Sequence, residues 1–448
     1  MSSRSYKFIV AGSLAATLLV VGAFGVTRSN SDETTVVDSP LPAVEVSNVI
    51  GAAGPPAADL DQLVEQLQAR LDVVPADHVA WATLGIAYVR QARVTADPSY
   101  YARADGALDE SFDVRPDDNF LAFAGRSTLA SARHEFADAK NFAEQGLEIN
   151  GFSAILLGAL SDAEVQLGRY DAADAATSRM LELQPDTPAY ARASYLAELR
   201  GDIAGATTLM QQALEGAGTP SDRAFALTIL GDLSFNAGAP GDALTLYNRA
   251  REQSPDDALA LAGKARAEAA LGQIETALDH YGELVETAPE PSYLIAYARL
   301  LESVGRVDEA AEQYALVDTV QQLFEANGVE ADAAPILDLA DRGDPAEALR
   351  EAETAVASRP FLLIHDAHAW ALHANDRDDE ALVAIDLALA LGTLDAKIWF
   401  HSGMIKHSLG DSNGAREDLR TALDINPFFD PLDAVVAKAT LVELGDPA

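Results

Sequence analysis

The stretch AFALTILGDLSFNAGAPGDALTLYNRAREQSPDD, residues 224–257, has the pattern of two short helices joined by a turn. Small and apolar residues recur at helical spacing up to Gly238, which can end the first helix. Ala243 and Tyr247 then mark one face of a second helix, which ends before Pro255. Two short helices cannot bury their shared face alone, so this unit must pack against further copies of itself.

The same pattern recurs along most of the chain. One alanine recurs at steps of 33 to 38 residues, as Ala104, Ala139, Ala173, Ala206, Ala243, Ala277, Ala310, Ala348, Ala381 and Ala415. Five residues before these alanines stand Gly168, Gly201, Gly238, Gly272, Gly305, Gly343 and Gly410. Twelve residues after them stand Pro116, Pro185, Pro255, Pro289, Pro360 and Pro427. Because the three registers coincide, we predict about ten stacked helix-turn-helix repeats.

Each register has a physical reason. Glycine adopts the left-handed conformation that ends a helix, a small alanine lets two helices approach closely, and proline cannot continue a helix. Ser99, His134 and Asp376 replace the turn glycine in three copies, which predicts looser or longer turns there. Extra residues near 93–99 and 321–328 are expected to lie in loops.

This combination of Leu230-Gly231, a turn glycine, an alanine five residues later and a proline after twelve more resembles the tetratricopeptide repeat family. The resemblance implies an all-α solenoid whose first helices line an inner, partner-binding face. The predicted parts are an apolar N-terminal segment (1–26), a flexible linker (27–56), an N-terminal capping helix (57–77), the solenoid (78–429) and a C-terminal capping helix (430–448).

The N-terminal segment predicts attachment to a membrane. Residues 8–26 carry no charge, and as a helix they would span about 28 Å, enough for a bilayer core. Arg4 and Lys7 precede them and acidic residues follow, so the bulk of the chain is expected outside the cytoplasmic membrane. The alternative is a signal peptide cleaved near residues 23–25, followed by secretion.

Composition excludes several function classes. The formal charge of −39, from 70 acidic and 31 basic residues, argues against nucleic acid and anionic lipid as partners. It fits either a solvated acidic surface or attraction of a basic partner. With no cysteine, the chain has no disulfide and no thiolate site.

No catalytic, cofactor-binding or metal-binding signature is present, so we expect a non-enzymatic protein without a cofactor. His365 and His368 lie three residues apart on one predicted helix, a spacing compatible with one zinc ion. Structural histidines with polar partners are the simpler interpretation.

By repeat register, the inner face should carry the partner-binding residues. These are Tyr195, Phe225, Asp232, Phe235, Trp370, His373, Lys397, Phe400, Met404 and His407. The last two complete repeats should bring Trp370, Phe400 and their neighbours into one cluster, with Lys397 at its edge. The cluster is either a recognition patch or core packed against the C-terminal helix, and both interpretations stay open here.

Two functions follow from these observations. The first is a scaffold that binds a protein or peptide on the inner face. The second is an assembly factor for membrane-linked maturation, because residues 63–89, LVEQLQARLDVVPADHVAWATLGIAYV, resemble the opening of membrane-anchored tetratricopeptide proteins of bacterial cytochrome c maturation. No oligomeric state follows from the sequence.

Overall fold

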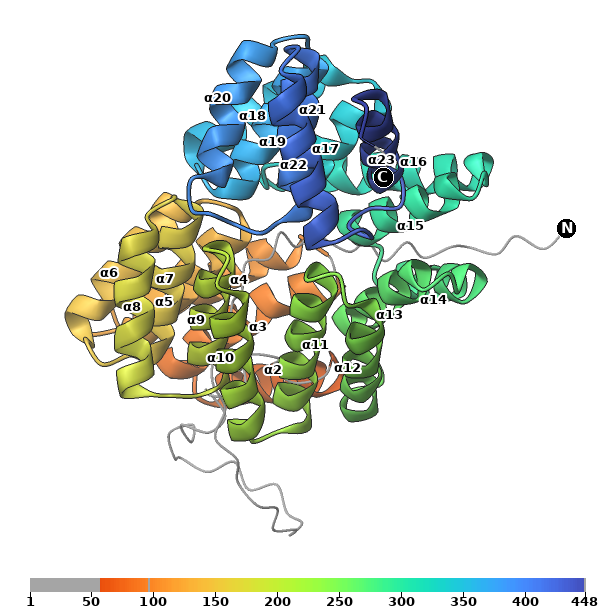
Figure 1. Cartoon of the computed structure of the whole chain (residues 1–448). Helices are drawn as coiled ribbons and strands as arrows, with labels where there is room; N and C mark the ends of the chain where they lie inside the picture. The colour runs from red at the N-terminus through yellow and green to blue at the C-terminus, as the bar shows by residue number, and fades with distance from the viewer. Residues whose placement is uncertain (1–56, 96, 447–448) are drawn as a thin grey trace, which may run out of the picture.

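The computed structural model describes residues 57–95 and 97–446, and all regular structure in this part of the chain is α-helical (Figure 1). Its 22 helices form ten consecutive pairs between two single helices, α2 (Ala57–Val73) and α23 (Asp433–Glu443). The pairs are α3 (His78–Thr95) with α4 (Tyr100–Val114), α5 (Phe120–Ala132) with α6 (Phe136–Ile149), α7 (Ala154–Gln166) with α8 (Tyr170–Leu183), α9 (Thr187–Leu199) with α10 (Ile203–Gly216), α11 (Pro220–Asn236) with α12 (Pro240–Gln253), α13 (Ala258–Ala270) with α14 (Ile274–Thr287), α15 (Pro291–Ser303) with α16 (Val307–Glu325), α17 (Ala333–Arg342) with α18 (Pro345–Ser358), α19 (Leu362–Ala374) with α20 (Asp378–Leu389), and α21 (Ala396–Ser408) with α22 (Ser412–Ile425). The prediction of an all-α repeat array is confirmed.

The turn inside each pair follows the glycine register. All seven predicted turn glycines have left-handed φ angles between 67° and 94°. His134 (φ 65°) and Asp376 (φ 58°) adopt the same conformation, so the prediction of looser turns at these two positions is wrong. At Ser99 the turn does differ from the glycine turns, because its φ is −61°, outside the left-handed region. Ser99 directly precedes α4.

The alanine and proline registers mark packing and helix ends. All ten register alanines are at most 2% exposed, because each lies where the second helix of a pair packs on the first. The register prolines each stand two residues after the last residue of a helix, as Pro255 does after α12. A further contact holds neighbouring repeats together: Tyr247 of α12 packs against Gly263 of α13, where a Cβ atom would lie 2.3 Å from the ring.

Part of each insertion lengthens a helix, which corrects the expectation that both lie in loops. Among first helices, α3 has 18 residues and α13 has 13; among second helices, α16 has 19 and α14 has 14. The lengthened ends contribute to one buried cluster, since Ala92 of α3 belongs to the same cluster as Val320 and Phe324 of α16. They are retained as helix because they bury apolar surface that a loop would expose.

The array curves until its two parts touch. Figure 1 shows α17–α22 lying above the curved row of helices α5–α12. Tyr170 at the start of α8 accepts a hydrogen bond from the backbone N–H of Leu362, 192 residues later, at 3.0 Å. Apolar residues of both parts also share a buried cluster, which includes Leu196 and Leu199 of α9 and Leu362 of α19. The superhelix is therefore closed by contacts between distant repeats.

The predicted membrane segment, residues 8–26, and the predicted linker lie outside the described residues. Across 57–95 and 97–446, none of the helices combines the length and the apolar character that crossing a bilayer requires.

Candidate partner-binding surface

Two residues of the predicted cluster, Trp370 and Phe400, lie in one group of rings with His401 and Phe429, which were not predicted. We call these four residues the C-terminal aromatic cluster. The centroid of the Trp370 ring lies 4.2 Å from that of His401 and 5.9 Å from that of Phe400, and Phe400 lies 5.6 Å from Phe429. Phe400 is only 2% exposed and packs with Leu441 of α23. A partner therefore cannot reach the Phe400 ring while α23 covers it.

His373 and Met404, two further residues of the predicted cluster, also have partners within the chain. His373 Nδ1 lies 2.5 Å from Asp378 Oδ1, and the His373 ring lies 4.9 Å from that of Trp370. Met404 is half-buried, and its Sδ accepts a hydrogen bond from Thr440 of α23 at 3.8 Å. His407 is half-buried near the end of α21. The contact with Thr440 ties Met404 to the C-terminal helix, and a binding role for the three residues stays a prediction.

Lys397 is part of an ion-pair network that fixes the start of α23. Its Nζ lies 3.4 Å from Asp433 and 3.8 Å from Asp430. Arg299 of α15 holds the same two carboxylates, with Nε 2.8 Å from Asp430 and Nη2 2.7 Å from Asp433, and its Nη1 lies 2.7 Å from Asp341. The two cations hold the pKa of Asp430 below its usual range, although burial alone would raise it. Lys397 is therefore engaged within the chain.

A buried histidine–aspartate pair in this region was not predicted. His401 is 1% exposed, its Nδ1 lies 2.7 Å from Asp366 Oδ1, and Trp370 stacks on its ring. The two residues are 35 positions apart, one more than the 34-residue step from Ala381 to Ala415, so they lie one register position apart on the neighbouring first helices α21 and α19. Their placement on neighbouring first helices, close to the same register position, was the signal available in the sequence.

The predicted residues of the central repeats divide into core and accessible surface. Phe225 and Phe235 of α11 are buried, at 8% and 1% exposed, and Phe235 lies beneath the guanidinium of Arg266, 4.1 Å from its centroid. Tyr195 of α9 and Asp232 of α11 are half-buried and remain accessible. The two phenylalanines therefore support this surface from below and do not form part of it.

Polar side chains from three consecutive first helices meet around these positions. We call this surface the central inner face: Tyr195 and Glu198 of α9, Asp232 and Asn236 of α11, and Arg266 of α13. Asn236 donates a hydrogen bond to Glu198 at 3.2 Å, and Arg266 donates to Asp232 at 2.9 Å. All five side chains are half-buried, so they are held in place and still reachable.

Glu198 is the least compensated charge on this surface. Burial, together with the nearby carboxylates of Asp232 and Asp395, raises its pKa to about 7, and the amide of Asn236 and the cation of Arg266 only partly oppose this rise. Tyr247 shares Asp232 with Arg266, donating to Asp232 Oδ1 at 2.7 Å. Glu198, Asn236 and Arg266 were not among the predicted residues, although each lies on the first helix of its repeat.

The structure places the two histidines that were considered as zinc ligands on one helix. His365 and His368 are half-buried on α19, and burial lowers the pKa of both. Among the residues that the structure describes, no three histidine or acidic side chains are grouped so that they could hold a metal ion.

Paired helices, left-handed turns and an inner face built from the first helices define a helical-repeat protein of the tetratricopeptide type. Family comparison agrees: tetratricopeptide repeat models match residues 190–258 and 262–319, and a further one matches residues 396–429. These matches support the tetratricopeptide repeat family for this array. A comparison with curated proteins found no match.

Comparison with solved structures found distant matches. A thermophilic tetratricopeptide protein of Thermus thermophilus, TTC0263, is 20% identical over 39% of this chain and 91% of its own, with a TM-score of 0.35. The APC/C hetero-tetramer Cut9-Hcn1 is 16% identical over 89% and 83%, with a TM-score of 0.44. The human IFIT1 dimer with m7Gppp-AAAA is 14% identical over 82% and 86%, with a TM-score of 0.47. At these identities and TM-scores, nothing about this chain is argued from the three matches.

Proposed function

We propose that this chain is a non-catalytic scaffold that recruits a protein or peptide on the central inner face. The observation that carries the proposal is the convergence of half-buried polar and aromatic side chains from α9, α11 and α13. Side chains fixed by their neighbours lose little freedom on binding, so such a surface binds at a lower entropic cost. Repeat families of this type are generally non-catalytic, and function here rests on the surface.

The charge of this surface favours a basic segment as the partner. Glu198 has an amide as its neighbour and a raised pKa, so a lysine or arginine brought by a partner would stabilise its carboxylate. The net charge of −39 would also speed the approach of a basic partner. The proposed partner is thus a protein or peptide that presents at least one cation to Glu198.

We further propose that residues 8–26 hold the array at the outer side of the cytoplasmic membrane. Support comes from the sequence alone, namely nineteen uncharged residues after Arg4 and Lys7. An N-terminus at or near Met1 and resistance to alkaline extraction are the expected results. A soluble protein that starts near Val26 would favour the cleaved and secreted form.

Site-specific photocrosslinking in native membranes tests the scaffold proposal. A crosslinking amino acid at Tyr195 and, separately, at Asn236 should capture the same protein. The matched controls are Phe152 and Val383, which are 77% and 65% exposed and lie away from this surface. Equal capture from all four positions would contradict the proposal.

The identity of the captured protein separates the two functions considered. Recovery of haem-maturation proteins would favour an assembly factor, as the resemblance of residues 63–89 suggests. Recovery of other envelope proteins would favour a general scaffold.

A further inference from the structure

Two rows of loops face one another along the line where the superhelix touches itself, which we call the seam. The first row consists of the turns inside four consecutive pairs, at His134, Gly168, Gly201 and Gly238. The second row consists of the chain segments where α16, α18, α20 and α22 end or are followed by the next helix, at Glu330, Pro360, Gly392 and Ile425. The two rows run in the same order along the chain, so each loop of the first row faces the corresponding loop of the second.

The seam contacts are close and involve mainly backbone. A Cβ atom on Gly168 would lie 2.7 Å from the carbonyl oxygen of Pro360, and one on Gly201 would lie 2.5 Å from that of Gly392. For Gly238 the corresponding distance to Ile425 O is 3.0 Å. No side chain larger than hydrogen fits at the first two positions without moving the opposite loop.

Three turn glycines with the same backbone conformation have open surroundings. At Gly272, Gly305 and Gly410, with φ of 78° to 79°, no atom lies within 4 Å of an added Cβ. Left-handed backbone geometry alone explains a glycine at these positions. At Gly168 and Gly201 the contact across the seam is a second and independent reason.

His134 occupies the first position of the row and contributes a side chain. Its Nδ1 lies 3.0 Å from the carbonyl oxygen of Glu330, and its ring stacks on Phe136 at 5.7 Å. Burial beside the cation of Arg359 lowers the pKa of His134 to about 4, so the neutral ring donates to the carbonyl. The hydrogen bond offsets the cost of a left-handed non-glycine residue.

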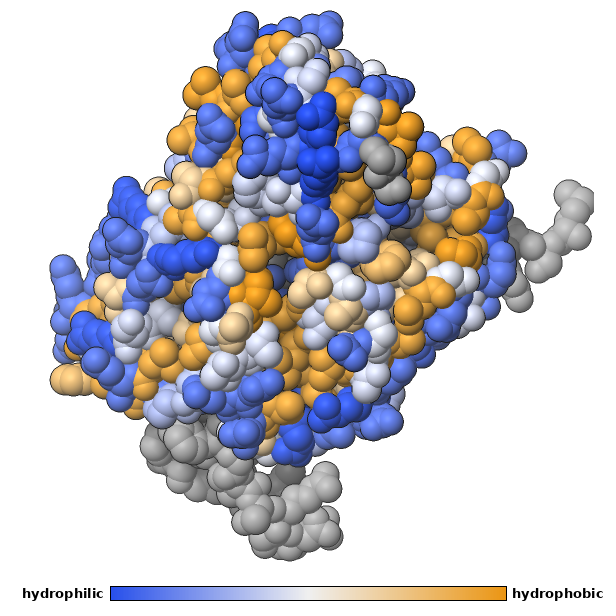
Figure 2. All heavy atoms as spheres, in the orientation of Figure 1, coloured by the Kyte–Doolittle hydropathy of each residue, from blue (hydrophilic) through white to orange (hydrophobic). Residues whose placement is uncertain are grey.

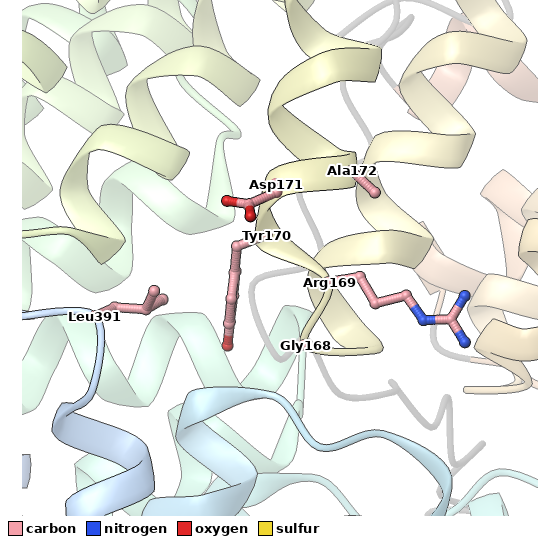
Figure 3. Close-up of a pocket in the computed structure, with 6 residues that line it drawn as sticks. All are labelled: Gly168, Arg169, Tyr170, Asp171, Ala172 and Leu391. Atoms are coloured by element: carbon pink, nitrogen blue, oxygen red, sulfur yellow. The ribbon is translucent and has the colours of Figure 1, made fainter.

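Side chains add to the seam at Tyr170. Figure 3 shows the Tyr170 ring pointing toward the C-terminal repeats, whereas Arg169 points away from them. The Tyr170 hydroxyl accepts from Leu362 N–H, and Leu391 lines the same open crevice. Figure 2 shows apolar side chains on the visible face where the upper and lower parts of the molecule meet.

We propose that the seam is a clasp that closes the superhelix, so that distant repeats fold and unfold as one unit and hold the inner face in one arrangement. Ordinary solenoid repeats interact only with their neighbours and open locally. Here opening at one turn must also release a loop about 190 residues away. This inference goes beyond the proposed binding function and does not depend on the partner.

Hydrogen exchange of the full chain, followed by mass spectrometry, tests the clasp with Gly201→Ala and the matched control Gly272→Ala. Both substitutions place alanine in a left-handed turn, but only Gly201 faces the seam. Gly272→Ala should speed exchange in α13 and α14 alone. Gly201→Ala should speed exchange in α9 and α10. It should also speed exchange by about tenfold in residues 386–396 across the seam.

A milder pair of variants covers the case in which Gly201→Ala does not fold. Tyr170→Phe removes the acceptor for Leu362 N–H, whereas Tyr314→Phe removes a hydroxyl that donates to Glu302 within the same pair of helices. Faster exchange around Leu362 in Tyr170→Phe, with no remote change in Tyr314→Phe, supports the clasp. Exchange that changes only near each substitution, in both pairs of variants, would overturn it.

Discussion

The C-terminal aromatic cluster and the central inner face both lie mainly on first helices of the repeat but have different surroundings. Phe400 lies on the first helix of its pair, as Tyr195 does, yet α23 covers Phe400, whereas Tyr195 is only half-buried. The first group is stabilised by apolar packing and ion pairs to the last helix. The difference teaches that repeat register locates the inner face, whereas the next element along the chain decides whether that face is free.

The largest expected effect is the loss of the Phe400 side chain. Phe400→Ala removes a ring that is 2% exposed and should lower the free energy of unfolding by about 3 to 5 kcal/mol. Urea unfolding measures the loss, with Val383→Ala, at a 65% exposed site, as the control. Unchanged stability together with lost partner capture would instead show that Phe400 belongs to a recognition patch. The contrast between a covered cluster and an accessible inner face would then be wrong.

Arg299→Ala tests how firmly the last helix is held over the cluster. The change leaves Asp341, Asp430 and Asp433 without their main shared cation, so we expect a loss of about 3 to 4 kcal/mol. Arg306→Ala is the matched control, since its pair with Glu309 is exposed and should contribute little to stability. Similar results for both variants would show that the network does not secure α23.

Much of this structure follows from the sequence, and the part that does not has a clear cause. Alanine, glycine and proline registers report on contacts between adjacent helices, so Ala243 and Gly238 were placed correctly. The contact of Gly201 with Gly392 was not predicted, because it depends on rotation accumulated over many repeats. Burial of Phe400 was left open, because the same residue pattern serves a covered and an uncovered inner face.

Glu198→Gln tests the uncompensated charge of the central inner face. Because the pKa of Glu198 is raised from 4.5 to about 7 in the folded chain, the folded state binds more protons than the unfolded state between these values. The stabilisation that comes from protonated Glu198 in the folded state is therefore fully present below pH 4.5, and it is lost as the pH rises through about 7. Removing the charge should stabilise the protein at about pH 8 by about 1 to 3 kcal/mol and have little effect at about pH 4.

Thermal unfolding of Glu198→Gln and the parent chain at both pH values checks this prediction. A difference in stability that does not change with pH would show that something other than the carboxylate causes it. If a basic partner binds at Glu198, the partner should also bind more weakly to Glu198→Gln, since the paired charge is lost.

Tyr195→Phe should have the smallest effect on stability and separates the two regions most clearly. The substitution keeps the ring of a half-buried side chain and removes only its hydroxyl, so the free energy of unfolding should change by no more than about 0.5 kcal/mol. If Tyr195 contacts the partner, the affinity for the captured protein should fall by a factor of about three to ten, the loss of roughly one hydrogen bond. Tyr314→Phe is the control, because it removes an exposed hydroxyl outside this surface. Weaker binding at constant stability is the reverse of what Phe400→Ala should show, and it would mark the central repeats as the recognition surface. Equal affinity of both tyrosine variants would show that Tyr195 does not belong to that surface.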